Sequence, residues 1–146
     1  MPVQVYSFVK TDDDVYRPWV PVKIMNADNP KKATIMHALL DTGADECLFT
    51  ATAVMEAGFE LKSSARTKEM QGVAKDKIMT WYHPFKIQVL KPDLKTAFWC
   101  SKVIEVACVE HDNIVPILGF TNLLCHFRLT FNYATRKLML DDRPLV

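Results

Sequence analysis

The alternation of hydrophobic and polar positions predicts a chain built mostly of short strands. It is clearest near the C-terminal end, where residues 127–133 and 136–140 form the two halves of an antiparallel hairpin across Ala134 and Thr135. Further strands are predicted at 19–24, 33–40, 78–90, 96–100 and 103–109. Several short strands at this spacing indicate an all-β barrel or sandwich.

One short helix is expected among these strands. Thr50 is a suitable N-cap, residues 51–57 follow it with helix-forming residues, and Gly58 fits the left-handed position that ends a helix. A second helical turn is expected at residues 121–124. The sequence therefore predicts an all-β fold with one or two short helices.

The composition is that of one globular domain, which we expect to span residues 1–146. Hydrophobic residues make up 49% of the 146 positions and charged residues 24%. The net charge is only +1, so no nucleic-acid partner is expected. No apolar run approaches the roughly 20 residues of a membrane span, and the N-terminal residues do not read as a signal peptide. We therefore expect a cytoplasmic protein with no membrane partner.

The cysteines and histidines do not form metal-binding patterns. The cysteines lie mostly in apolar surroundings without a C-x-x-C pair, which favours buried free thiols over disulfides or a zinc site: Cys47, Cys100, Cys108 and Cys125. The histidines are scattered, without the spacing of metal ligands: His37, His83, His111 and His126. We expect neither a metal nor a cofactor.

Residues 38–45, Ala-Leu-Leu-Asp-Thr-Gly-Ala-Asp, contain the candidate chemistry. A buried strand would fix the position of Asp41, and the Thr42 hydroxyl can hold the loop by hydrogen bonding. Gly43 has no Cβ, so backbone or ligand can approach it closely. The alternative is a strand end closed by an ordinary Asx turn, and the three residues by themselves do not exclude it.

This segment resembles the active-site motif of the retropepsins, the retroviral-type aspartic proteases. Residues 117–119, Ile-Leu-Gly, resemble the second motif of that family, and residues 70–81 lie where it has its flap hairpin. The order and spacing fit over about residues 18–141. The complete hairpin at 127–140 resembles cellular and retrotransposon members more than viral enzymes.

The resemblance implies a retropepsin-like barrel and an aspartic endopeptidase that acts on polypeptides. Its catalytic residues would be Asp41, Thr42 and Gly43, and its substrate-binding residues Ala44, Asp45, Gln71, Gly72 and Val73. One chain has one such aspartate, so a homodimer is implied in which two Asp41 carboxylates share a proton and activate a water.

The terminal hairpin is the expected dimer interface, through an apolar face that includes Leu138 and Leu140. The alternative is that these leucines only close the core of their own subunit. A charge substitution at Leu138 or Leu140 would separate the two cases.

One position departs from the family pattern. The second motif of viral members has an arginine after its glycine, which pairs with the acid that corresponds to Asp45, and this chain has Phe120. We therefore expect Asp45 to be partly exposed and to point toward the peptide groove. Phe120 and the glycine-poor flap leave two alternatives to an active protease: a weak or inactive peptide-binding or dimerisation module on the same fold, and an unrelated β-barrel with a chance motif.

Overall fold

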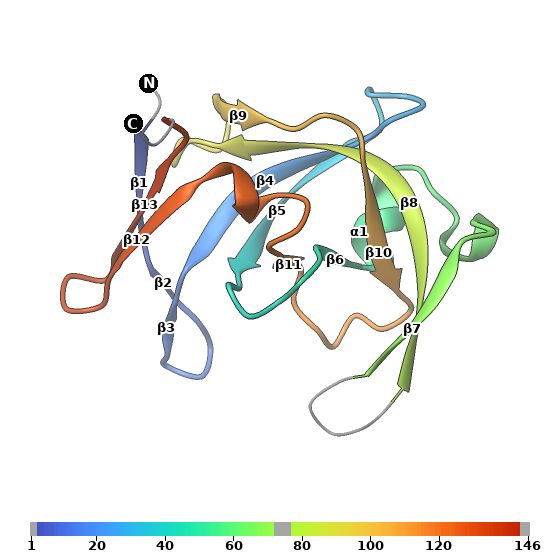
Figure 1. The fold of residues 1–146 in the computed structure, drawn as a ribbon, viewed down its shortest axis with the longest axis horizontal. Coiled ribbons are helices and arrows are strands. Elements are labelled where there is room, and N and C mark those ends of the chain that lie inside the picture. The colour runs from blue at the N-terminus through green and yellow to red at the C-terminus, as the bar shows by residue number, and fades with distance from the viewer. Residues whose placement is uncertain (1–2, 72–76, 144–146) are drawn as a thin grey trace.

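The structure, a computed structural model, describes residues 3–71 and 77–143 and is dominated by strands (Figure 1). The larger sheet contains β4 (Trp19–Asn26), β5 (Ala33–Leu40), β6 (Leu48–Thr50), β7 (Thr67–Gln71), β8 (Lys77–Leu90), β9 (Ala97–Cys100), β10 (Ile104–Val109) and β11 (Ile117–Leu118). A smaller sheet contains β1 (Val3–Ser7), β12 (Arg128–Asn132) and β13 (Lys137–Asp141), and β2 (Val9–Lys10) pairs with β3 (Tyr16–Arg17). The helical elements are α1 (Ala51–Glu56) and the single 3-10 turns η1 (Leu61–Ser63) and η2 (Leu124–His126). The expected all-β fold with short helices is confirmed.

The larger sheet closes on itself into a barrel. Its strands follow the order β10-β6-β11-β5-β4-β8, and β8 also pairs with β10, which completes the ring. The interior is filled by apolar side chains, among them Val22 and Ile24 of β4 and Ile87 of the neighbouring β8, which are fully buried. Phe49 and Phe85 meet edge to face, with ring centroids 5.3 Å apart. Burying these side chains sets the strand register, since a slip by one residue would turn them outward.

The two-residue strand β11 lies between β5 and β6. Ile117 and Leu118 pair in parallel with Leu39 and Leu40, and Ile117 also pairs with Leu48 of β6. The segment that resembles the second motif therefore lies directly beside the strand that ends at Asp41. No sequence periodicity marks a strand this short.

Helix α1 is capped by a residue far away in the sequence. Thr50 has the extended backbone of an N-cap residue, but its side chain makes no capping hydrogen bond. Instead the Thr52 N–H donates to Asp112 Oδ1 at 3.0 Å, and this bond lowers the pKa of the Asp112 carboxyl. At the other end Gly58 has a φ of 81°, the left-handed conformation expected of it.

The C-terminal hairpin forms as expected, but Leu138 and Leu140 are only 1% and 2% exposed. They pack in the same core as Tyr6 of β1, which pairs with the second edge of β13. The expectation that these leucines face a partner subunit is therefore wrong, and they close the core of their own subunit. Their alternation with exposed residues is the same in either case, so the sequence pattern did not distinguish inside from outside.

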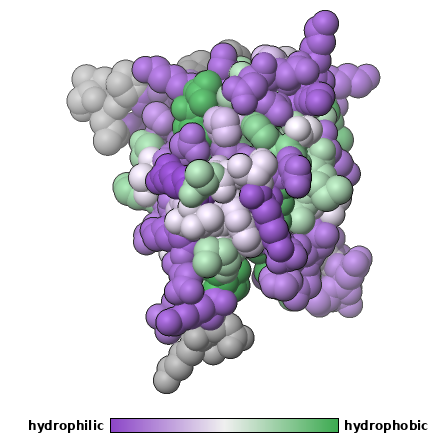
Figure 2. Space-filling model, turned by 90° about the vertical axis from the view of Figure 1, so that its right-hand side faces the viewer, coloured by the Kyte–Doolittle hydropathy of each residue, from purple (hydrophilic) through white to green (hydrophobic). Residues whose placement is uncertain are grey.

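The β7 end of the larger sheet and the terminal sheet of β1, β12 and β13 lie at opposite ends of the molecule (Figure 1). The surface on the side of β7 and β8 presents mostly hydrophilic residues with scattered hydrophobic ones (Figure 2). Within residues 3–71 and 77–143, no helix is long and apolar enough to cross a membrane.

Candidate active site

Asp41 directly follows β5 and lines a cleft of about 510 Å³. Strand β7 contributes residues 68–71 to the lining, and β6 and β11 contribute apolar side chains. The residues that line it are Asp41, Gly43, Ala44, Asp45, Glu46, Leu48, Lys68, Glu69, Met70, Gln71 and Ile117. The fold therefore brings most of the predicted site residues to one cavity.

The loop after Asp41 is closed by the Asp41 side chain. The Gly43 N–H donates to Asp41 Oδ1 at 2.9 Å, and the Ala44 N–H donates to the Asp41 carbonyl at 3.2 Å. A Cβ on Gly43 would lie 3.3 Å from the same carboxylate oxygen, so glycine keeps this approach free. This is Asx-turn geometry, which the catalytic and the purely structural interpretations share. Thr42 beside it is exposed and takes part in no side-chain hydrogen bond of the described residues.

Strand β11 and the turn after it hold this loop through backbone hydrogen bonds. The Asp41 N–H donates to the Leu118 carbonyl at 3.2 Å, the Phe120 N–H to the Ala44 carbonyl at 2.8 Å, and the Thr121 N–H to the Asp45 carbonyl at 2.7 Å. These three bonds fix the loop at both ends. The position of the Asp41 carboxylate is therefore determined by the whole barrel rather than by its own strand alone.

The backbone bonds also determine which groups of the loop remain for a peptide. The carbonyls of Ala44 and Asp45 and the Gly43 N–H are already used inside the subunit. The Gly43 carbonyl and the Asp45 N–H have no such partner among the described residues, and both lie in the cleft lining. They are the groups with which an added strand could pair.

Gln71, a predicted substrate-binding residue, is exposed at the end of β7 and lines the cleft. The other two predicted flap residues, Gly72 and Val73, lie outside the described residues.

Asp45 is exposed, as the replacement of arginine by Phe120 led us to expect. It forms no ion pair within the described chain. Two arginines of the terminal hairpin that could have paired with it have other partners: Arg128 lies 4.0 Å from Asp141, and the Arg136 guanidinium lies 3.8 Å from the Tyr16 ring centroid. Phe120 itself is 59% exposed.

Sequence reasoning did not identify Glu46 and Lys68 of the cleft lining, nor Tyr82, which contacts Glu46. The Tyr82 hydroxyl lies 3.1 and 3.0 Å from the two carboxylate oxygens of Glu46, and Lys68 Nζ lies 3.7 Å from Glu46 Oε2. Burial, together with the hydrogen bond to Glu46, raises the pKa of Tyr82. The position of Glu46 directly after the motif was a usable signal. Its contacts with Lys68 and Tyr82, which are 22 and 36 positions later, left no signal in the sequence.

The expectation about the thiols is wrong for half of them. All four cysteines are free, but only Cys47 and Cys108 are buried, whereas Cys100 and Cys125 are exposed. Burial raises the pKa of Cys47 to about 11, so this thiol near the candidate loop is not a nucleophile. The apolar neighbours of Cys100 and Cys125 in the sequence are more buried than these cysteines themselves: Phe98 and Trp99 are half-buried, and Leu123 and Leu124 are buried.

No group of three or more potential metal ligands occurs in residues 3–71 and 77–143. His83 is the one histidine buried there, and its Nε2 lies 2.7 Å from the Leu61 carbonyl, which makes it a hydrogen-bonded core residue.

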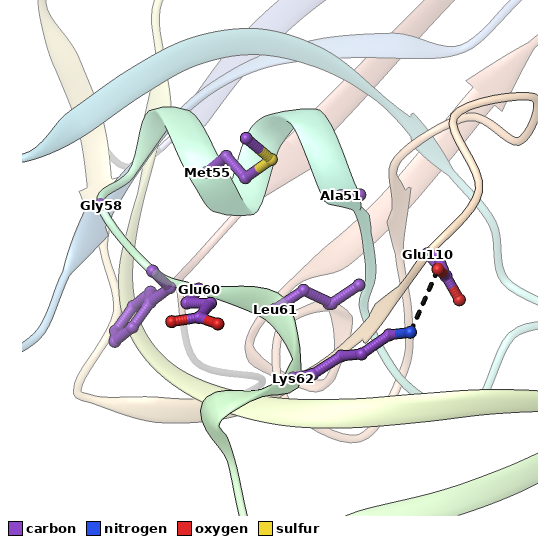
Figure 3. A pocket seen from close by; sticks show the side chains of 8 residues that line it. Ala51, Met55, Gly58, Glu60, Leu61, Lys62 and Glu110 are labelled. Carbon is purple, nitrogen blue, oxygen red and sulfur yellow. Dashed lines mark ion pairs between the residues drawn. The ribbon is translucent and has the colours of Figure 1, made fainter.

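A second cavity, of about 640 Å³, lies on the outer side of the barrel between α1 and η1 (Figure 3). Its walls are mainly apolar and include Met55 and Leu61. The charged residues at its rim include Lys62 and Glu110, which form an ion pair at 3.2 Å. Neither Asp41 nor its loop reaches this cavity, so the candidate chemistry belongs to the smaller cleft.

Comparisons with known proteins support the fold and leave the family open. No protein-family model and no curated protein matches the sequence. Among solved structures, the chain is similar to the crystal structure of a retropepsin-like aspartic protease from Rickettsia conorii, with a TM-score of 0.57 and 17% identity. The match covers 94% of this chain and 91% of that one. The retropepsin-like fold is therefore confirmed, while the resemblance to cellular rather than viral members stays a prediction.

Proposed function

We propose that the chain is an aspartic endopeptidase that hydrolyses peptide bonds as a homodimer, with one Asp41 from each subunit. The proposal takes residues 1–146 as a single domain and the protein as cytoplasmic. One observation supports it most directly: Asp41 lines a cleft, and backbone hydrogen bonds from the second motif segment hold its loop. The shared fold with a retropepsin-like protease is consistent with it.

The chemistry would need two aspartates. Two carboxylates about 3 Å apart cannot both be ionised, so they share one proton. The ionised one removes a proton from a bound water, which attacks the scissile carbonyl carbon. The protonated one donates to the developing oxygen, and a proton then reaches the leaving nitrogen as the C–N bond breaks. No metal or cofactor takes part in this scheme.

The peptide would bind as an extended strand. The Gly43 carbonyl and Asp45 N–H would pair with its backbone, and Ala44 and the flap strand up to Gln71 would flank it. The same role is proposed for Gly72 and Val73. Water would be excluded when the substrate fills the cleft.

The dimer surface would lie beside the catalytic loop, because a two-fold axis must pass between the two Asp41 side chains. Thr42 and Phe120 are exposed there, and the Phe120 N–H is bonded to the loop itself. A large exposed aromatic side chain at this place is a suitable contact for a second copy. Leu138 and Leu140 are not part of this surface.

The test compares the wild type with Asp41→Asn, which removes the carboxylate with little change of shape. Cleavage of unfolded protein substrates should show a bell-shaped pH profile with an acidic optimum and should disappear in Asp41→Asn. The wild-type activity per subunit should fall on dilution as dimers dissociate. Cleavage by Asp41→Asn at the wild-type rate would exclude Asp41 from the mechanism.

The alternative, a peptide-binding or dimerisation module without catalytic activity, predicts a different result in the same experiment. The exposed Phe120 in place of an arginine favours it. A module of this kind would form dimers and bind peptides, but neither wild type nor Asp41→Asn would cleave them.

A further inference from the structure

Glu46 presents a carboxylate to the cleft that the proposed hydrolysis does not use. It follows Asp45 directly, lines the same cavity and has a side chain that is 23% exposed. A carboxylate that is largely withdrawn from water loses free energy of hydration unless partners replace it. How Glu46 is held therefore bears on what the cleft can bind.

One side of Glu46 is held rigidly by the barrel. The Tyr82 hydroxyl, on the buried face of β8, lies 3.1 and 3.0 Å from the two carboxylate oxygens. The Arg66 guanidinium stacks 4.2 Å from the Tyr82 ring centroid, which further fixes the ring. A hydroxyl has one proton to donate, whereas a carboxylate can accept about four hydrogen bonds. Tyr82 thus orients Glu46 without saturating it.

The other side of Glu46 has a weak, replaceable partner. Lys68 Nζ lies 3.7 Å from Oε2, beyond the 2.7–2.9 Å of a good charged hydrogen bond, and the Lys68 side chain is 60% exposed. Pairs of this kind contribute about 0–1 kcal/mol. Lys68 is on the flap strand β7 and is the one cation among the residues that line the described cleft.

We propose that Glu46 is a specificity residue that selects peptides with a lysine or arginine side chain at a position flanking the scissile pair of residues. Lys68 pairs with the Glu46 carboxylate in the free protein, and the cation of the substrate displaces Lys68. This inference rests on the proposed protease function and adds the class of substrate. Because Glu46 is preoriented by Tyr82, an incoming cation can form a shorter hydrogen bond than Lys68 does at little additional cost in side-chain entropy.

The test uses synthetic octapeptides with a central Leu–Phe pair, in which one flanking position at a time is lysine or norleucine. Norleucine has nearly the same length and apolar stem as lysine but no charge. The wild type should cleave the lysine peptide with a kcat/KM roughly fivefold higher at one or more positions. Glu46→Gln should lower this ratio to about one, and Lys68→Met should raise it.

A matched control exists outside the cleft. Glu110 forms a comparable partly exposed pair with Lys62 beside the second cavity, so Glu110→Gln makes the same change of charge and should leave the lysine preference unchanged. Tyr82→Phe removes only the hydroxyl and should reduce the preference, because Glu46 is then free to turn toward Lys68.

The outcomes separate this inference from the proposed function. Asp41-dependent cleavage without a lysine preference, or a Glu46→Gln variant that slows all peptides alike, would refute the specificity role and leave the protease standing. If no peptide is cleaved, calorimetry of peptide binding to the Asp41→Asn protein decides. Tighter binding of the lysine peptide that Glu46→Gln abolishes supports the specificity role, and equal binding of the two peptides overturns it. If Glu46→Gln does not fold, the Lys68→Met comparison decides in the same way.

Discussion

Gly119 lies directly against the backbone of Glu46, so that a Cβ built on Gly119 would overlap the Glu46 carbonyl group. The Gly119 N–H also donates to Cys47 Sγ at 3.4 Å. The two segments are more than seventy positions apart in sequence, and glycine is the residue that permits this approach. The contact therefore couples the second motif to the loop of the candidate site.

Gly119→Ala should lower the free energy of unfolding by about 3 kcal/mol, because its methyl group meets backbone that cannot rotate away. Urea unfolding followed by circular dichroism measures this. Gly43→Ala is the matched comparison, since its Cβ would meet only Asp41 Oδ1 at 3.3 Å and should cost much less stability. Equal losses in the two variants would contradict the close approach at Gly119.

Leu138 gives the second prediction, because it is 1% exposed in the core beneath the terminal sheet. Leu138→Ala should cost about 3 kcal/mol of stability, and Leu138→Asp should prevent folding. Thr130→Asp, at an exposed position of the neighbouring strand β12, should change stability little. A Leu138→Asp protein that stays folded as a monomer would instead revive the hairpin as the dimer interface.

The elements that sequence reasoning located well are those whose signal is local. The predicted strand at 33–40 coincides with β5, and the predicted hairpin coincides with β12 and β13 to within a residue or so. In these segments the side-chain period of two and the turn residues are both present in the sequence. The left-handed Gly58 at the end of α1 is a further example.

The features that sequence reasoning missed depend on contacts between segments that are distant in the sequence. Strand β11 has two residues and exists because β5 and β6 leave a gap that it fills. Asp112 caps α1 from sixty positions away, and Tyr82 reaches Glu46 across thirty-six. The same limit affected the site: the Asp-Thr-Gly loop was found from its sequence, whereas the pair formed by Glu46 and Lys68 required the fold.

The cysteines give the third prediction, which concerns accessibility. Cys100 and Cys125 are exposed, whereas Cys47 and Cys108 are buried and burial raises the pKa of both buried thiols. Under native conditions a maleimide reagent should therefore modify two thiols quickly, and after denaturation four. Mass spectrometry counts the additions, and the Cys100→Ser and Cys125→Ser variants should each lose one fast addition. Rapid native labelling of Cys47 would show that the loop region opens more than this structure allows.

Asp141 gives the last prediction, which concerns the dependence of stability on pH. Its side chain is 1% exposed at the end of β13, and it accepts hydrogen bonds from Arg143 Nε at 2.9 Å and Nη2 at 2.8 Å. These bonds, with the backbone N–H of Arg143 and the more distant Arg128, lower the pKa of Asp141 to about 2. In the unfolded chain an aspartate titrates near pH 3.9, so the folded state holds the ionised form more tightly. Ionised Asp141 therefore stabilises the fold at pH values above about 4, and this contribution disappears as the pH falls from about 4 toward 2.

Urea unfolding of the wild type and of Asp141→Asn should show a difference in stability at neutral pH that shrinks across this acidic range. Arg143→Gln removes the donor instead of the acceptor, and its difference in stability from the wild type should show the same pH dependence. A difference that stays constant down to about pH 2 would show that the ion pair does not contribute to stability.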